Sequence, residues 1–266
     1  MIFKSILKKN LILKNSELNK SCYIFGNGAS IKGFDLKFFN NLPVFSCGWL
    51  FLHKDYHKLN VLCDFETHPG IFFPIWKNEY SKKIEFNYLN YVFKKKKRFE
   101  KSKHFFTSLS NYPGLIFYKN IFYLYHFGCK KFDKKHTNPV SKFSLLENSL
   151  YSMIGIASYM GFKKIYLVGM DYLFEKPING HFYEKIHHEI PYNKKNEDNN
   201  KYFFDYFKNE IDFILIKSQH NSNSFLKTLS YSELFKINEL KNFNYDIIDI
   251  NNLELLNKTN LNYKIF

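Results

Sequence analysis

The densest group of titratable side chains in this 266-residue sequence is the segment 180–188, Gly-His-Phe-Tyr-Glu-Lys-Ile-His-His. Histidine is the usual general base near neutral pH, and a tyrosine hydroxyl can stabilise a departing phosphate. The three histidines could also hold a metal together with Glu184 and Glu189, but their spacing matches no strong zinc signature. We therefore expect one of these histidines to do chemistry, with His181 and His188 as the candidates, and the others to be surface residues.

A glycine turn, Gly26-Asn-Gly-Ala-Ser30, follows an apolar strand-like run. Glycines such as Gly26 and Gly28 let backbone amides approach a phosphate or a ribose, and Ser30 can cap the segment that follows. Asn27 offers both a donor and an acceptor and tolerates a left-handed turn. A nucleotide contact and a simple tight turn both explain this pattern. A P-loop does not, because the Gly-Lys-Ser/Thr ending is missing.

Two acids, Asp64 and Asp171, are predicted to lie just past the ends of buried strands. At that edge of a parallel sheet an acid can bind ribose hydroxyls, orient a base or hold a metal. The alternative is a helix N-cap or a turn acid. For Asp171, which stands between Gly169 and Tyr172, we favour a place in the site.

Apolar runs that alternate with helical patterns predict an α/β fold with a mostly parallel sheet, covered on both faces. The predicted strands are 22–25, 43–47, 59–63, 105–110, 165–168 and 245–250, and the predicted helices are 35–41, 148–161, 202–218 and 230–240. Gly161 is the expected stop of the 148–161 helix. The type of 116–127 stays open.

The length fits one Rossmann-like domain, 21–266, which follows a basic amphipathic arm, 1–20. The stretch 180–200 is polar and rich in proline, histidine and asparagine, so we expect a lid over about 172–200. Parallel strands end at one edge of a sheet. The Gly26–Ser30 turn and the Gly169–Asp171 strand end are therefore predicted to meet where an open α/β fold binds its ligand.

The composition excludes a disordered chain, because 45% of the residues are hydrophobic and 20% are aromatic. The net charge of +15 invites a nucleic-acid partner. However, Arg98 is the only arginine among 39 basic residues. Arginine is the residue that reads phosphate and guanine in a bidentate manner. We therefore expect no nucleic-acid partner.

A lysine-rich surface also suits an anionic membrane. In the arm, Phe3, Ile6 and Leu11 alternate with lysines, but the apolar run is too broken for a secretory signal or a membrane span. Contact with a membrane and packing against the domain both remain open. The cysteines, Cys22, Cys47, Cys63 and Cys129, show no C-x-x-C spacing, which predicts a reduced, cytoplasmic protein. With its basic surface, we expect the protein to be peripheral at the inner membrane face.

Taken together, these segments resemble the bacterial lipooligosaccharide sialyltransferases that use CMP-sialic acid. That family has a strand with a Gly-Asn-Gly-Pro-Ser turn, matched here by Gly26–Ser30, and a Cys-Asn pair where this chain has Cys47-Gly48. A Ser-Gly-x-Tyr helix and an Ile-Tyr-Leu-x-Gly-x-Asp strand follow, matched from Ser149 and by Ile165–Asp171. The chain also resembles the broader motility-accessory, MptE-like glycan-associated group, which shares the glycine turn and the Gly-x-Asp strand end.

The sialyltransferase resemblance implies a single GT-A-variant domain with a lid, and inverting transfer of a sugar from its nucleotide without a metal or other cofactor. It implies that a histidine deprotonates the acceptor hydroxyl and that two tyrosines stabilise the leaving phosphate. The first tyrosine position falls on Leu173, beside Tyr172, and the second near Tyr183. The family's histidine lies further along, where this chain has none, so His181 is the predicted base and His188 the reserve.

The sequence therefore predicts a glycosyltransferase that acts on a nucleotide-sugar donor and a glycan or glycolipid acceptor. The alternatives are an MptE-like protein of other transferase chemistry, or a non-catalytic basic module that binds an anionic glycan or a membrane. Whether the chain forms a homo-oligomer stays open. The predicted nucleotide contacts are Gly26, Asn27, Gly28, Ser30, Gly48, Asp64, Asn148, Ser149, Gly169 and Asp171.

Overall fold

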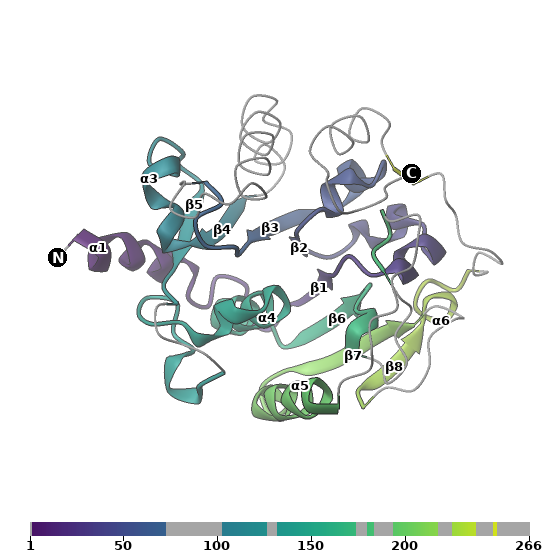
Figure 1. The fold of residues 1–266 in the computed structure, drawn as a ribbon. Helices are drawn as coiled ribbons and strands as arrows, with labels where there is room; N and C mark the ends of the chain where they lie inside the picture. The colour runs from purple at the N-terminus through teal and green to yellow at the C-terminus, as the bar shows by residue number, and fades with distance from the viewer. Residues whose placement is uncertain are drawn as a thin grey trace.

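The computed structural model describes residues 2–72, 103–126, 132–173, 180–183, 194–217, 225–237 and 247–248. Within them eight strands form one sheet in the order β5-β4-β3-β2-β1-β6-β7-β8, and every neighbouring pair is parallel (Figure 1). The strands are β1 (Ser21–Phe25), β2 (Val44–Cys47), β3 (Val61–Glu66), β4 (His104–Ser108), β5 (Ile121–Leu124), β6 (Lys164–Val168), β7 (Asp212–Lys217) and β8 (Lys227–Ser230). The predicted α/β fold with a parallel sheet is confirmed.

Five α-helices accompany the eight strands in the described chain. They are α1 (Ile2–Lys8), α3 (Tyr112–Leu115), α4 (Ser149–Met160), α5 (Lys194–Phe207) and α6 (Tyr231–Phe235). Single 3-10 turns make up much of the remaining helical structure: η1 (Lys9–Leu13), η2 (Ala29–Gly33), η3 (Leu36–Asn40), η4 (Leu50–Leu52), η5 (Tyr56–Lys58), η7 (Leu109–Asn111), η8 (Lys134–His136), η9 (Ser144–Glu147) and η10 (Asp171–Leu173). None of the described helices is both long and apolar enough to cross a membrane.

Both faces of the sheet are buried, as the near-continuous apolar strands predict. On one face α4 and α5 pack their apolar side chains, such as Met153 and Phe203, onto Ile24 and Phe45. On the other face the short turns after β1 and β2 cover Phe25 and its neighbours. Figure 1 shows α4 lying across the middle of the sheet, beside β1 and β6.

The helix α4 begins and ends as its sequence indicates. Asn148 accepts a hydrogen bond from the Leu150 amide as the N-cap. Gly161 takes a left-handed conformation (φ 92°) and ends the helix, which confirms the predicted stop.

The strand order reverses between β1 and β6. From β1 the chain adds β2 to β5 on one side of the sheet, and then returns through α4 to place β6, β7 and β8 on the other side. The carboxyl ends of β1 and β6 therefore flank the topological switch point, which is where open α/β sheets bind their ligands.

The helix predicted for 202–218 is wrong in its second half, because α5 ends at Phe207 and 212–217 form β7. In β7, Phe213 and Leu215 pack into one core cluster, while Ile214 and Ile216 pack into the other. This two-residue period belongs to a strand buried on both faces. A short apolar run of that kind is easily mistaken for a buried helix segment.

Other predicted boundaries also move. The helix expected over 35–41 is the 3-10 turn η3, and that expected over 230–240 is shortened to α6, preceded by β8. Part of the predicted lid, 194–200, is the first half of α5, and much of the rest lies outside the described residues. Of the strand expected over 245–250 the structure describes two residues, and Ile248 forms an antiparallel bridge with His53.

Candidate functional site at the carboxyl edge of the sheet

The turn after β1 lies directly against the loop after β6, as predicted. The Gly26 amide donates to the Val168 carbonyl at 2.8 Å, and the Gly28 amide donates to the Gly169 carbonyl at 3.0 Å. These bonds hold the two predicted segments together across the switch point. They also occupy the Gly26 and Gly28 amides, which the sequence assigned to a phosphate. The nucleotide contact at these two residues stays a prediction.

The two glycines are needed because the loops approach so closely. A Cβ atom on Gly28 would lie 2.5 Å from the carboxyl group of Asp171 and 2.7 Å from the Gly169 carbonyl oxygen. A Cβ atom on Gly26 would lie 2.5 Å from the same oxygen. Only a residue without a side chain fits at either position.

Asp171 supports the turn from within the protein. Its carboxylate is fully buried and accepts hydrogen bonds from the Ser30 amide, at 2.8 Å, and from the Ser30 hydroxyl. Burial raises the pKa of this carboxyl to about 6, against the opposing effects of the Ser30 hydrogen bonds and of the nearby His181. The sequence predicted that Asp171 faces the ligand crevice. In the structure, Asp171 and Ser30 are bonded to each other and hold the turn in place.

The segment 180–183 docks onto this turn. Gly28 and His181 form an antiparallel bridge, and the Phe182 amide donates to the Asn27 carbonyl at 3.0 Å. The half-buried His181 ring stacks on Tyr183 with centroids 5.0 Å apart. Tyr183 in turn stacks on Trp49 at 5.6 Å. The structure thus brings two of the predicted catalytic residues to the switch point.

The other two predicted catalytic residues are less defined. Tyr172 lies in η10, directly after Asp171, which places its backbone at the switch point. His188 lies outside the described residues.

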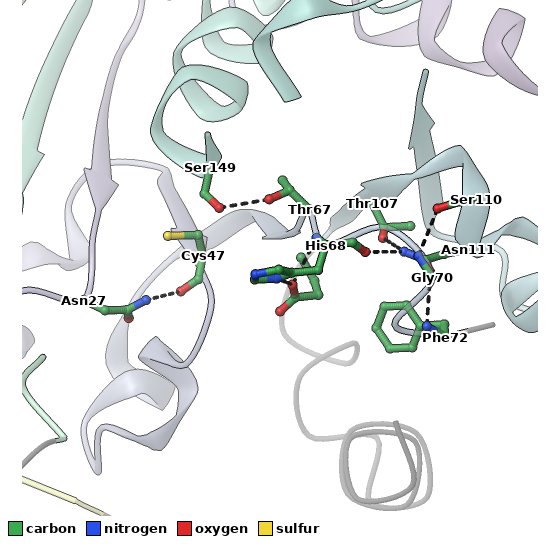
Figure 2. Close-up of polar contacts among 11 residues, drawn as sticks. Asn27, Cys47, Thr67, His68, Gly70, Phe72, Thr107, Ser110, Asn111 and Ser149 are labelled. Atoms are coloured by element: carbon green, nitrogen blue, oxygen red, sulfur yellow. Dashed lines mark hydrogen bonds and ion pairs between the residues drawn. The ribbon is translucent and has the colours of Figure 1, made fainter. Parts of the chain in front are cut away.

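Asn27 carries an acceptor without a partner. Its Nδ2 donates to the Cys47 carbonyl at 3.2 Å, which joins the turn after β1 to the end of β2 (Figure 2). Its Oδ1 is buried and has no hydrogen-bond partner within the described chain. Buried acceptors are normally satisfied, so an orphan here calls for a donor from outside the protein.

Gly48 makes room for Asn27. Its φ of 56° is left-handed, and a Cβ atom here would lie 2.6 Å from Asn27 Nδ2. The predicted nucleotide contact at Gly48 is thereby replaced by an indirect role, since the missing side chain leaves Asn27 its place.

The structure corrects the predicted position of Asp64. The predicted strand end at 63 is wrong, because β3 continues to Glu66 and Asp64 lies inside it. The buried carboxylate accepts from the Ser46 hydroxyl at 2.9 Å and from the Phe65 amide at 3.0 Å. It links β2 to β3 from within the sheet.

The real ends of β3 and β4 carry a polar network whose contacts the sequence did not predict (Figure 2). The Thr67 and Ser149 hydroxyls lie 3.0 Å apart, which ties the loop after β3 to the first turn of α4. The exposed Asn148 is the cap of that helix. Ser149 is thus at the carboxyl edge, as predicted, although its partner was not foreseen.

Glu66 and His68 form the most polar pair of this network. His68 Nδ1 lies 2.5 Å from Glu66 Oε1; the carboxylate is buried and the imidazole is exposed. The hydrogen bond and the charge of Glu66 raise the pKa of His68. The sequence Glu-Thr-His after an apolar strand was the available signal, but it needed the correct strand end. Among the described residues, no group of three or more metal-ligating side chains is placed to hold an ion.

Neither the family models nor the curated proteins contain a match to this chain. Among solved structures, the sialyltransferase CstII from Campylobacter jejuni in complex with cytidine-5′-monophosphate is 16% identical, with a TM-score of 0.49, covering 92% of this chain and 100% of that one. The α-2,3-sialyltransferase Cst-I from Campylobacter jejuni is 18% identical, with a TM-score of 0.49 and coverage of 87% and 88%. At these values the reaction has to be inferred from this chain's own residues.

Proposed function

We propose that this chain is a sialyltransferase-like glycosyltransferase that transfers a sugar from a nucleotide-activated donor, CMP-sialic acid or a related compound, to a glycan or glycolipid. The observation that carries the proposal is Asn27 Oδ1, a buried acceptor without a partner in the described chain, at the switch point of a parallel sheet. Leaving such an acceptor unsatisfied costs about 1–3 kcal/mol. The amino and hydroxyl groups of a cytidine nucleotide are donors that would satisfy it.

The amides of Gly26, Gly28 and Ser30 are already hydrogen-bonded within the protein, so we assign the binding of the donor to side chains. The stacked rings of Trp49, Tyr183 and His181 lie beside the Gly28 turn and form an aromatic wall at the switch point. A tyrosine hydroxyl can stabilise the charge that develops on a departing phosphate. We assign that role to Tyr183 and Tyr172, in line with the motif resemblance. We also propose that the transfer inverts the anomeric configuration and needs no metal. Activity that persists after EDTA is added would support metal independence.

A nucleotide panel tests the donor site directly. CMP, UDP, GDP and CMP-sialic acid are added separately, and thermal unfolding is followed, because a ligand that binds the folded state alone raises its stability. We expect CMP and CMP-sialic acid to raise the melting temperature, and the Asn27→Ala variant to lose most of that rise. Asn60→Ala, an exposed asparagine at the opposite end of β3, is the matched control. No response to any nucleotide would favour the non-catalytic basic module, and a response to a different nucleotide would favour other transferase chemistry.

We further propose that the enzyme works at the inner face of a membrane, where a glycolipid acceptor would lie. We give the name N-terminal apolar patch to four exposed side chains, Phe3 on α1 and Ile116, Phe117 and Tyr118 after α3; Phe117 is 92% exposed. Ser5, Ile6 and Lys9 on the N-terminal arm border one shallow groove with Ile116 to Lys119.

The N-terminal arm is packed on the domain and also presents this patch. Leu7 is buried against the β5 edge, while Lys9 Nζ donates to the carbonyls of Lys119 and Ile121, the latter at 2.8 Å. Lys4 and Lys8 are exposed on the same helix. Exposed rings among lysines, on a chain of net charge +15, suit an anionic lipid surface.

A further inference from the structure

The Glu66–His68 pair combines a histidine, which can act as a base, with a carboxylate that can orient its ring. The Glu66 carboxylate is 3% exposed and lies 2.5 Å from Nδ1 of the exposed His68. A buried carboxylate that accepts a hydrogen bond from Nδ1–H fixes the imidazole tautomer and leaves Nε2 as the lone-pair nitrogen. Nε2 is therefore the atom of this pair that can receive a proton from a ligand.

The backbone that carries His68 is held from two sides. The fully buried Asn111 donates through Nδ2 to the His68 carbonyl at 3.0 Å and to the Thr107 hydroxyl at 2.7 Å, and its Oδ1 accepts from the Phe72 amide at 3.1 Å. On the other side, Thr67 is tied to Ser149. The backbone at His68 is thus tied to the loop after β4 and to α4 by the contacts that Figure 2 draws, while the imidazole is exposed. Such anchoring gives a catalytic group a defined position.

The pair stands at the same edge of the sheet as the donor site, but on a different strand. Neighbouring strands lie about 4.8 Å apart, so β3 is roughly 10 Å from β1 in the order β3-β2-β1. His181 and Tyr183 lie on the β1 side, against the turn that holds Asn27. A donor and an acceptor that lie side by side along this edge would therefore contact Asn27 and His68 respectively.

We propose that His68 is the general base of the transfer and that Glu66 is its positioning residue. His68 Nε2 takes the proton of the acceptor hydroxyl while the acceptor oxygen bonds to the anomeric carbon. The bond between that carbon and the phosphate oxygen breaks, and the nucleotide leaves with its electron pair. This inference rests on the proposed function, and it moves to His68 the role that the sequence gave to His181.

The test measures transfer from CMP-sialic acid to a fluorescent lactoside, together with CMP binding by thermal shift. In His68→Ala we expect kcat to fall by about 10²–10⁴-fold, the size of a general-base contribution, while the CMP shift is retained. Added imidazole should restore part of the turnover, which a purely structural role of His68 would not allow. His57→Ala, an exposed histidine bonded to the Lys54 carbonyl, is the matched control and should keep its turnover.

Glu66→Gln tests the positioning role. We expect a lower kcat, an unchanged KM for the donor, and an acidic limb of the pH–rate profile that moves to lower pH, because the Glu66 charge no longer supports the imidazolium. In the described chain, Glu66 is the charged side chain in contact with the imidazole, and Thr67 and Asn111 beside it are neutral.

The outcomes separate the two proposals. If wild-type protein binds CMP and transfers sugar, but His68→Ala keeps turnover within about threefold of wild type, the base assignment alone is overturned. The same holds if His181→Ala, rather than His68→Ala, is the variant that imidazole rescues. If the wild-type chain neither binds nor uses any nucleotide donor, the proposed function is overturned, and the base assignment with it.

Discussion

The carboxylate of Asp171 accepts hydrogen bonds from both the amide and the hydroxyl of Ser30, which closes the carboxyl ends of β1 and β6 onto each other. The hydrogen bond from the Ser30 amide to the carboxylate measures 2.8 Å, and both residues are at least 99% buried. A charge-assisted contact of this kind, deep in the sheet edge, fixes the turn that presents Asn27. The site is therefore built by packing between two loops, and its integrity can be tested through the groups at their contact.

Gly28→Ala should separate those loops. The added Cβ atom would lie 2.5 Å from the Asp171 carboxyl group and 2.7 Å from a carbonyl oxygen, so backbone has to move. We expect the free energy of unfolding to fall by about 1–3 kcal/mol, measured by urea denaturation, and the CMP thermal shift to disappear. Gly155→Ala, inside α4, is the control: its Cβ atom would meet the side chains of Leu145 and Phe143, so it should alter stability but leave CMP binding intact. Equal CMP binding in both variants would contradict this prediction.

The buried Asp171 should make stability depend on pH. Its pKa is about 6 in the folded protein and 3.8 in the reference state, so the folded state binds the proton more tightly. This contribution is fully present below about pH 4 and is lost as the pH rises through 6, a change of about 3 kcal/mol. Asp171→Asn lacks it.

Urea denaturation between pH 4 and pH 8 measures the difference in unfolding free energy between wild type and Asp171→Asn. As the pH rises, the unfolding free energy of the wild type should fall relative to that of Asp171→Asn. Asp205→Asn, at a side chain that is 63% exposed, is the control and should show no comparable change. A pH-independent difference for Asp171→Asn would show that the folded-state pKa is not raised.

Gly48→Asn should displace Asn27. Asparagine tolerates the left-handed φ at this position, so the main effect comes from a Cβ atom placed 2.6 Å from Asn27 Nδ2. Loss of the Asn27–Cys47 hydrogen bond should cost about 1 kcal/mol of unfolding free energy and weaken the CMP shift. In an Asn27→Ala background the clash is relieved, so Gly48→Asn should cost less there. Additive effects of the two substitutions would argue against this contact.

The N-terminal apolar patch should bind anionic vesicles. We expect Phe117→Ser and Phe3→Ser each to weaken co-sedimentation with phosphatidylserine-containing vesicles several-fold, and salt to weaken the wild type, because lysines supply part of the attraction. Tyr202→Ser, at an exposed ring on α5, is the control. Unchanged binding by both patch variants would move the membrane contact elsewhere or remove it.

The sequence by itself determined the parallel sheet, the stop at Gly161 and the pairing of the Gly26–Ser30 turn with the Gly169–Asp171 strand end. These features depend on local patterns: apolar runs that must be buried on both faces, and glycines at turns. Local patterns also explain the failures. The residues around 212–217 carry no turn signal that distinguishes a strand from a helix. The sequence predicts Asp64 at the end of its strand because an acid is unusual inside a buried strand.

The tertiary structure alone decided what each polar group does. Asp171 accepts hydrogen bonds from Ser30, and Asp64 accepts one from Ser46. The amides of Gly26 and Gly28 donate to the carbonyls of Val168 and Gly169. Glu66 and His68 became a candidate site only once β3 was extended to its true end and Asn111 was placed beside it. A buried hydrogen bond joins residues that are far apart in the chain, so its partner follows from strand order and register rather than from spacing.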